Sequence, residues 1–312
     1  MANGAGAGRI DVHHHFFPPE YFANMGAMTE RPPVRDWTLD RTLEELDRND
    51  VDTAMLSLSP PGIHHRTEAE NRALARTVNE HAAALRAERP AKFGHFASVP
   101  MPDVAGTLTE IEYAMDTLGA DGIQLMTSYG DKWPGFPEFD AVFDELDRRK
   151  AVVFIHPLEP NCCAGLIDWV PPALVEFTAD TTRCVFSLLF SGTLARCPDI
   201  RFIVCHAGAS VPIFAGRAGV MGLGRAHAER MPKGIDHELR RIHYDIALAA
   251  NRPALLALFD YVPVSQVLLG TDYPFGSTAE TLSGLEAFGL GGDDVQKVCR
   301  GNAERLIPRL AA

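Results

Sequence analysis

The sequence predicts a closed barrel of eight parallel strands, each followed by helical chain. Strand-like and helix-like segments alternate along the 312 residues, and such alternation is typical of parallel βα units. Eight units in this length suit a (β/α)₈ barrel, for which about 250 residues is typical. The alternative, an open doubly wound sheet, favours a glycine-rich phosphate loop after the first strand, and none is present there. We therefore expect one barrel domain over residues 1–312, with small loop insertions and a flexible N-terminus at 1–8.

Eight short apolar segments have the character of strands. The fifth and sixth, AVVFIH and IRFIVCH, are of the fully buried type, and Pro100 follows the third. In chain order we expect strands at Arg9–His13, Val51–Ser59, Lys92–Val99, Asp121–Thr127, Ala151–His156, Ile200–His206, Ile242–Ile246 and Gln266–Thr271.

The segments between these strands have helical periodicity or helix-terminating residues. Leu39, Leu43 and Leu46 share one face of the first helix, Gly119 ends a later one, and a proline opens another. We expect a loop at Asn161–Pro172. The predicted helices are Trp37–Arg48, Thr67–Glu88, Val104–Leu118, Phe139–Arg149, Ala173–Arg196, Pro212–Ala228, Pro253–Tyr261, Thr278–Phe288, Asp293–Cys299 and Asn302–Leu310.

Composition narrows the functional classes. Hydrophobic residues make up 46% and charged residues 22%, which is globular rather than disordered or coiled-coil composition. The net charge of −12 argues against nucleic acid and anionic membranes as partners. No apolar run has the length of a membrane span, and the N-terminus does not resemble a signal peptide. We therefore expect a cytoplasmic protein whose six cysteines are free thiols. We interpret the adjacent pair Cys162 and Cys163 as loop packing, with a functional role as the alternative.

Four predicted strands end in potential metal ligands, and the remaining strand ends show no such residue. His13 and His15 follow the first strand with one residue between them, so they point to the same side. His156 ends the fifth strand, His206 the sixth, and Asp272 the eighth. Catalytic groups of such barrels lie at the carboxyl ends of strands. His13, His15, His156 and Asp272 can therefore bind one Zn²⁺ and leave a position for substrate or water.

These residues carry a resemblance to the amidohydrolase superfamily. Its most specific parts are IDVHHHFFP near the N-terminus, CHAGASVP at 205–212, HYDIALAA at 243–250 and LLGTDYPFG at 268–276. The chain resembles the decarboxylase branch that contains aminocarboxymuconate semialdehyde, γ-resorcylate and methylsalicylate decarboxylases. The resemblance implies the same four metal ligands and an active-site histidine at His206. It further implies a homodimer in which Arg217 reaches the neighbouring subunit's site, and an aromatic pocket residue at Phe275. A solvated helix arginine and a core phenylalanine are the alternatives.

Two departures from family patterns bear on the metal. The fourth strand, GIQLMT, lacks the lysine that many two-metal hydrolases carboxylate, so we expect one divalent ion per chain. The γ-resorcylate type has glutamate where this chain has His13. The nitrogen-rich set favours Zn²⁺, and Mn²⁺ is possible. The sequence has no dinucleotide fingerprint, so we expect no organic cofactor.

The leading hypothesis is metal-dependent, non-oxidative decarboxylation of a small aromatic acid of the salicylate or 6-methylsalicylate type, or of a carboxymuconate-like acid. Asp272 would be both ligand and proton donor in the salicylate type of mechanism. In the muconate type, water activated by the metal and His206 takes the larger part. Hydrolysis of a lactone or amide at the same ligands is the alternative. A non-catalytic barrel is a third, disfavoured by the polar residues at strand ends.

Overall fold

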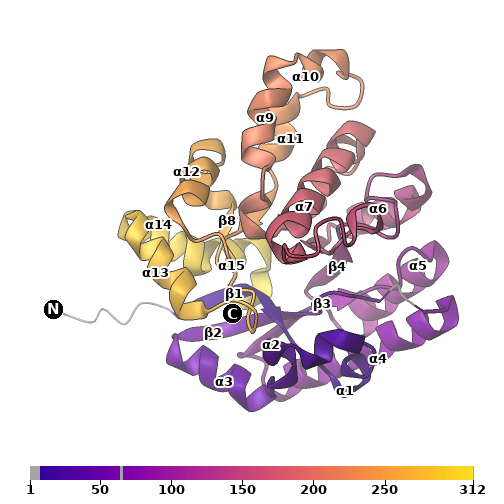
Figure 1. The fold of residues 1–312 in the computed structure, drawn as a ribbon, viewed down its shortest axis with the longest axis vertical. Coiled ribbons are helices and arrows are strands. Elements are labelled where there is room, and N and C mark those ends of the chain that lie inside the picture. The colour runs from indigo at the N-terminus through magenta and orange to yellow at the C-terminus, as the bar shows by residue number, and fades with distance from the viewer. Residues whose placement is uncertain (1–7, 64–65, 312) are drawn as a thin grey trace.

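The computed structural model describes residues 8–63 and 66–311, so the expected flexibility of residues 1–7 lies outside the described residues. Eight strands form one parallel sheet in sequence order, surrounded by the helices (Figure 1). The predicted (β/α)₈ barrel is confirmed. The strands are β1 (Arg9–His15), β2 (Val51–Ser57), β3 (Phe93–Ser98), β4 (Gly122–Met126), β5 (Val152–His156), β6 (Arg201–Val204), β7 (His243–Asp245) and β8 (Val267–Leu268).

Backbone hydrogen bonds between β1 and the segment after β8 nearly close the barrel. The Val12 amide donates to the Leu269 carbonyl at 2.9 Å, the Asp272 amide to the His13 carbonyl at 2.9 Å, and the His15 amide to the Tyr273 carbonyl at 2.8 Å. These bonds run on past the end of β8. They hold Asp272 directly against the two histidines of β1.

Helices connect the strands, and side-chain caps define several of their starts. Thr67 and Glu70 form a capping box at α4, and Asp103 and Ser277 cap α5 and α13. The α-helices are α1 (Pro19–Phe22), α2 (Pro32–Arg35), α3 (Leu39–Arg48), α4 (Glu68–Glu88), α5 (Val104–Glu112), α6 (Asp140–Arg148), α7 (Pro172–Ser191), α8 (Thr193–Arg196), α9 (Val211–Val220), α10 (Leu223–Ala226), α11 (Ile235–Arg240), α12 (Arg252–Tyr261), α13 (Thr278–Phe288), α14 (Gly292–Gln296) and α15 (Asn302–Leu306).

Several predicted boundaries are wrong, and glycine or proline explains three of them. Gly192 at φ +86° divides the expected 173–196 helix, and Gly222 at φ +70° divides the 212–228 helix. The last helix ends at Leu306, shortly before Pro308. β1 is longer than predicted and β8 shorter, because the chain leaves the ladder as it turns to present Asp272. The short helices α1, α2 and α11 were not predicted.

The apolar interior of the barrel adjoins the histidines at Phe154, whose ring centroid lies 5.1 Å from that of His13. Ile10, Val12, Met55, Phe154 and Leu268 pack with helix α15 in one buried cluster. The larger cluster lies between the strands and the outer helices. The carboxyl ends of the strands carry buried polar side chains instead. Within the described residues, no helix combines the length and apolarity needed to cross a bilayer.

Candidate metal centre

Four predicted ligands meet at the carboxyl ends of the strands. His13 and His15 lie on β1, His156 is the last residue of β5, and Asp272 follows β8. All four are buried. One potential ligand atom from each lies within 4.8 Å of the others. His14 points elsewhere, as the alternation along β1 predicts: its Nδ1 lies 3.0 Å from Asp11 Oδ2 and its ring stacks on Tyr273.

The hydrogen bonds around the cluster determine which nitrogens face each other. His13 Nδ1 lies 2.9 Å from Asp245 Oδ2, His15 Nδ1 3.3 Å from the Ser57 carbonyl, and His156 Nδ1 2.7 Å from the Pro157 carbonyl. Because these partners are acceptors, each Nδ1 carries the hydrogen and each neutral ring presents an Nε2 lone pair. All three lone pairs are directed into the cluster.

The short distances among these atoms fit a shared cation. His15 Nε2 is 3.2 Å from both His13 Nε2 and His156 Nε2, and Asp272 Oδ1 is 2.9 Å from His15 Nε2 and 3.2 Å from His13 Nε2. Lone pairs at this separation repel one another unless positive charge lies between them. Ligands at about 2.1 Å from one ion are about 3.0–3.4 Å apart. Three imidazoles and a carboxylate therefore fit one divalent metal.

The pKa shifts of the four candidate ligands show which charges the cluster favours. Burial, followed by the neighbouring rings of His15 and His13, holds the pKa of His156 well below its usual value, and burial lowers that of His15. Burial opposes a charge on His13, but Cys205, Asp245 and Asp272 together raise its pKa well above 6.5. Burial disfavours the Asp272 anion, but His13, His15 and His206 hold the pKa of Asp272 well below 3.8. The four side chains thus favour positive charge at the centre of the cluster, where their ligand atoms face one another.

Sequence reasoning missed Asp245, which lies at the end of β7. Its buried carboxylate accepts from His13 through Oδ2, and from the amides of His206 and Ala247 through Oδ1 at 2.9 and 3.0 Å. Partners of this kind fix the orientation of a ligating imidazole. The expectation that only four strand ends carry such residues was therefore wrong. The aspartate in HYDIALAA, at the end of a predicted strand, was the available signal.

Close backbone packing allows Asp245 to approach β1. A Cβ on Gly270 would lie 2.8–2.9 Å from Asp245 and His13, so this position requires glycine. Asp11 joins β1 to the segment that precedes Asp272. Its carboxylate accepts hydrogen bonds from the Thr271 hydroxyl at 2.6 Å and from the Thr271 and His13 amides. Asp272 itself adopts φ +60°. Such a conformation is costly outside glycine and is held by its surroundings.

His206 lies beside the cluster but in a turn rather than on a strand. β6 ends at Val204, and His206 begins the 3₁₀ turn η5 (His206–Gly208) with φ +57°. Its Nε2 is 3.5 Å from Asp272 Oδ2, and no described protein group makes a hydrogen bond to this buried atom. The Asp245 carboxylate fixes its amide. The position leaves Nε2 free to contact a ligand.

Phe275 lies beside the cluster, and Arg31 next to it lines a cavity whose wall includes none of the four ligands. The Phe275 ring centroid is 5.8 Å from that of His15, and the Arg31 guanidinium lies 5.5 Å from the Phe275 centroid. Arg31 also lines a cavity of about 570 Å³, together with Met28, Pro60, Leu158, Asn161 and Phe177. These residues follow β1, β2 and β5 or belong to α7. Arg31 was not predicted, because the short helices after β1 were themselves missed.

Arg217 lies apart from the cluster. It is exposed on α9 and does not line the 570 Å³ cavity. Helices α9, α10 and α11 project from the barrel (Figure 1). The large apolar side chains of Ile213, Phe214, Val220 and Met221 are exposed there. Within this chain, Arg217 has no route to the metal ligands.

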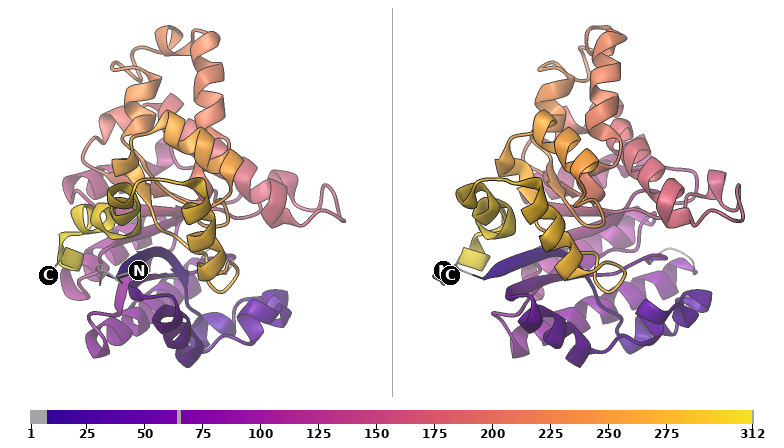
Figure 2. Two further views of the ribbon diagram at one scale, coloured as in Figure 1. Left: turned by 90° about the vertical axis from the view of Figure 1, so that its left-hand side faces the viewer. Right: turned by 60° about the vertical axis from the view of Figure 1, so that its left-hand side comes forward.

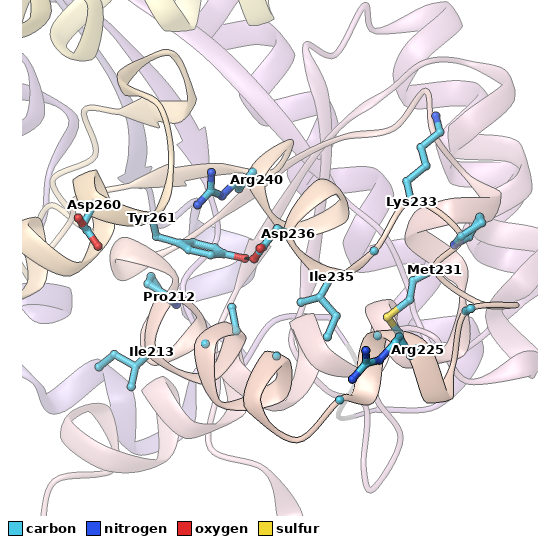
Figure 3. Close-up of a pocket in the computed structure, with 18 of the residues that line it drawn as sticks. Pro212, Ile213, Arg225, Met231, Lys233, Ile235, Asp236, Arg240, Asp260 and Tyr261 are labelled. Carbon is cyan, nitrogen blue, oxygen red and sulfur yellow. Dashed lines mark hydrogen bonds between the residues drawn. The ribbon is translucent and has the colours of Figure 1, made fainter.

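A larger cavity, of about 950 Å³, lies on this projecting part and not over the ligands (Figure 3). It is lined by residues of α9, α10, α11 and α12 and by none of the metal-ligand candidates. Three of its polar groups lie together: Tyr261 donates to Asp236 at 3.1 Å, and the Arg240 guanidinium lies 5.2 Å from the Tyr261 ring centroid. The four candidate metal ligands lie at the strand ends instead.

The comparisons with known proteins identify the family of this chain. The sequence matches the amidohydrolase family over residues 10–309. The chain belongs to this family. It is 35% identical to 6-methylsalicylic acid decarboxylase of Penicillium expansum over 319 residues, which cover 97% of each chain.

Solved structures of this family share the fold. A crystal structure of an amidohydrolase II superposes with a TM-score of 0.89 at 26% identity, covering 96% of this chain and 99% of that one. A dihydroxybenzoic acid decarboxylase of Polaromonas sp. JS666, solved with manganese and 2-nitroresorcinol, superposes with a TM-score of 0.84 at 20% identity, covering 96% and 97%.

Proposed function

We propose that this member of the amidohydrolase family is a metal-dependent, non-oxidative decarboxylase of a small aromatic acid of the salicylate type. The observation that carries the proposal is the buried set of three imidazoles and one carboxylate, with the free Nε2 of His206 beside it. We choose this substrate class because the chain is 35% identical to a 6-methylsalicylic acid decarboxylase. Carboxymuconate-like acids are the next class to assay.

The cluster would bind its ion through His13, His15, His156 and Asp272. When bound, the ion would supply Lewis-acid charge for the oxygens of the acid substrate. The ligand set is nitrogen-rich, which favours Zn²⁺; the manganese of the dihydroxybenzoic acid decarboxylase keeps Mn²⁺ as the second choice. One ion per chain is expected, because the fourth strand has Gln124 and no lysine. Gln124 makes hydrogen bonds to the Leu58 backbone instead.

Asp272 is the group we assign to proton transfer. Its low pKa keeps the carboxylate anionic before substrate binds. It can therefore accept the proton of the substrate's hydroxyl and return a proton to the ring carbon that bears the carboxylate. Protonation at this carbon weakens the bond to the carboxylate, and CO₂ leaves. We assign both transfers to Oδ2, because Oδ1 faces His13 and His15.

His206 would orient the substrate and share in proton movement. Its Nε2 lies on the Oδ2 side of Asp272, and its backbone is fixed by Asp245. An imidazole nitrogen can donate or accept a hydrogen bond, so His206 can handle a proton there. Phe275 would pack against the ring, and Arg31 would offer positive charge to an acid entering the 570 Å³ cavity.

A substrate panel separates this proposal from hydrolysis, which would use the same ligands. Metal-loaded protein is assayed for CO₂ from salicylates, resorcylates and carboxymuconate-like acids, beside lactones and amides. We expect CO₂ from a hydroxybenzoate-type acid, without oxygen or an organic cofactor. Turnover of lactones with no CO₂ from any acid would replace the decarboxylase with a hydrolase. Bound metal with no turnover of either panel would favour a non-catalytic barrel.

We further propose a homodimer in which α9 faces the second subunit. The exposed apolar side chains of this helix and the projecting position of Arg217 support it. Arg217 would then bring a guanidinium, which binds carboxylates in a bidentate way, toward the partner's pocket. Sedimentation of an active monomer would refute the dimer. An unchanged kcat/KM in Arg217→Ala would refute only the role of the arginine.

The cysteines support a cytoplasmic location, which we also propose. Cys184, Cys197, Cys205 and Cys299 are buried free thiols, and no disulfide joins the described cysteines. Free thiols in a chain of this length are typical of a reducing compartment. Fractionation of cells that produce the natural protein tests the location.

A further inference from the structure

Two adjacent thiols at the rim of the pocket have no part in the proposed reaction. Cys162 and Cys163 lie in one 3₁₀ turn, η4 (Asn161–Cys163), between β5 and α7. Their Sγ atoms are 3.0 Å apart, with Cys162 exposed and Cys163 half-buried. The chain leading into α7 extends outward from the barrel (Figure 2). We propose that this pair is a site of reversible oxidation, where a peroxide converts two thiols to a disulfide and so alters the pocket.

The other four cysteines are protected from such chemistry. All four are buried. Burial raises the pKa of Cys197 to about 11 and also raises those of Cys184, Cys205 and Cys299. The thiolate is the reactive form of cysteine, so these side chains are poor nucleophiles near neutral pH. An oxidant therefore meets one accessible pair.

Arg183 distinguishes the two thiols of the pair. Its Nη2 lies 3.5 Å from Cys163 Sγ, where positive charge stabilises the sulfur as it becomes a nucleophile. The hydrogen bond with Cys163 is the largest cause of the raised pKa of Cys162. Cys163 is accordingly the attacking thiol, and Cys162 is the thiol that closes the disulfide.

The reaction balances with hydrogen peroxide as the oxidant. Cys163 attacks one peroxide oxygen, the O–O bond breaks, and a sulfenic acid forms as hydroxide leaves and takes up the proton of the thiol. Cys162 then attacks the sulfenic sulfur, the S–O bond breaks, and the oxygen leaves as water with the second thiol proton. One peroxide is reduced to two waters as two thiols become one disulfide.

Closure of the disulfide changes the wall of the pocket. The sulfurs must approach from 3.0 Å to a bond of about 2.05 Å within one turn. Asn161, in the same turn, lines the 570 Å³ cavity, and Cys163 lines an adjacent cavity of about 220 Å³. Glu159 borders both cavities and accepts from the Gly165 amide at 3.1 Å. A rearranged turn therefore moves side chains in the wall of the 570 Å³ cavity, which none of the metal-ligand candidates lines.

Mass spectrometry of the metal-loaded protein tests the oxidation itself. Treatment with one equivalent of hydrogen peroxide should remove the mass of two hydrogens, with the loss mapped to the peptide that contains Cys162 and Cys163, and dithiothreitol should restore it. Cys197→Ser, which removes a buried thiol, should behave like the wild type. Cys162→Ser should retain a sulfenic acid on Cys163 and form no disulfide. A disulfide elsewhere, or oxidation of Cys163 beyond sulfenic acid in the wild type, would overturn the proposal.

The effect on activity rests on the proposed function and is measured separately. Oxidised wild type should show a several-fold rise in KM for the acid, with a smaller change in kcat and unchanged metal content, all reversed by dithiothreitol. Peroxide should leave the KM of Cys162→Ser much less changed. A disulfide that forms without altering KM would refute the link to the pocket. Absence of turnover in the reduced protein would instead refute the decarboxylase, and the mass measurement would still decide the oxidation.

Discussion

Replacing Asp245 with asparagine tests how the protein prepares His13 for metal. The substitution keeps the size of the side chain but removes its charge. An amide oxygen can still accept from the backbone amides of His206 and Ala247, which now bond to Oδ1. The amide NH₂ then occupies the place of Oδ2, opposite the Nδ1 hydrogen of His13. Two donors cannot bond to each other, so His13 must move its hydrogen to Nε2.

The metal affinity lost in Asp245→Asn follows from the position of His13 Nε2. His13 Nε2 lies 3.2 Å from His15 Nε2, inside the cluster, so a hydrogen there removes one of four ligands. Loss of a group that orients a ligating histidine typically lowers metal affinity by about 10–100-fold. We expect Asp245→Asn to lower the metal affinity by about 100-fold, or about 2.7 kcal/mol, at the upper end of this range. The reason is that the substitution forces His13 into the wrong tautomer and does not only remove the group that orients it.

Competition with a chelator measures the metal Kd, and thermal unfolding checks that each variant is folded. Asp121→Asn is the matched control, because this side chain is also buried and ion-paired, but it bonds to Arg309 at 2.6 Å rather than to a metal ligand. The control should keep the wild-type Kd. A folded Asp245→Asn protein with the wild-type Kd would refute the reasoning about His13.

Three further predictions follow from other parts of the site and the barrel. His206→Ala should lower kcat strongly while metal content stays near that of the wild type, because His206 faces the ligands without being one. If elemental analysis shows that metal content falls as much as kcat, His206 would be a metal ligand. Asp272→Asn should lower both kcat and metal content, because one carboxylate binds the metal and moves the proton. A variant that keeps its kcat or its metal content would show that the carboxylate does not have both roles. His95 is buried, and burial lowers its pKa to about 4. The unfolded state therefore binds the proton more readily, and stability is lost as pH falls from about 6.5 to about 4. At the lower pH the loss is about 3 kcal/mol. His95→Leu should remove this component, seen as a smaller pH dependence in urea unfolding; identical pH profiles of the two proteins would contradict it.

The sequence was sufficient to predict the barrel and to predict that the four candidate ligands lie side by side, for reasons that are local. Alternating faces along β1 bring His13 and His15 together whatever the neighbouring strands do. The rule that strand ends share one edge of the barrel then brings His156 and Asp272 to them. These inferences need only the order and direction of strands.

What the sequence could not provide depends on departures from regular structure. His206 and Asp272 have positive φ angles. The His206 amide donates to Asp245, and the amide of Thr271, next to Asp272, donates to Asp11, so these bonds join strands far apart in the chain. Periodicity does not contain such information. Arg31 lies in short helices whose position over Phe275 is set by tertiary packing. The role of Arg217 depends on a second subunit, which one chain does not describe.

Stepwise return of metal to metal-stripped protein measures the central claim directly. Zn²⁺ and Mn²⁺ are added in separate titrations, and bound metal per chain and CO₂ release from 6-methylsalicylate or salicylate are recorded at each step. The account predicts that activity rises in proportion to bound metal and stops rising at one ion per chain. A His13→Ala/His156→Ala double variant should bind little metal and release no CO₂. Full CO₂ release from the stripped protein, a requirement for two ions per chain, or undiminished metal binding by the double variant would contradict it.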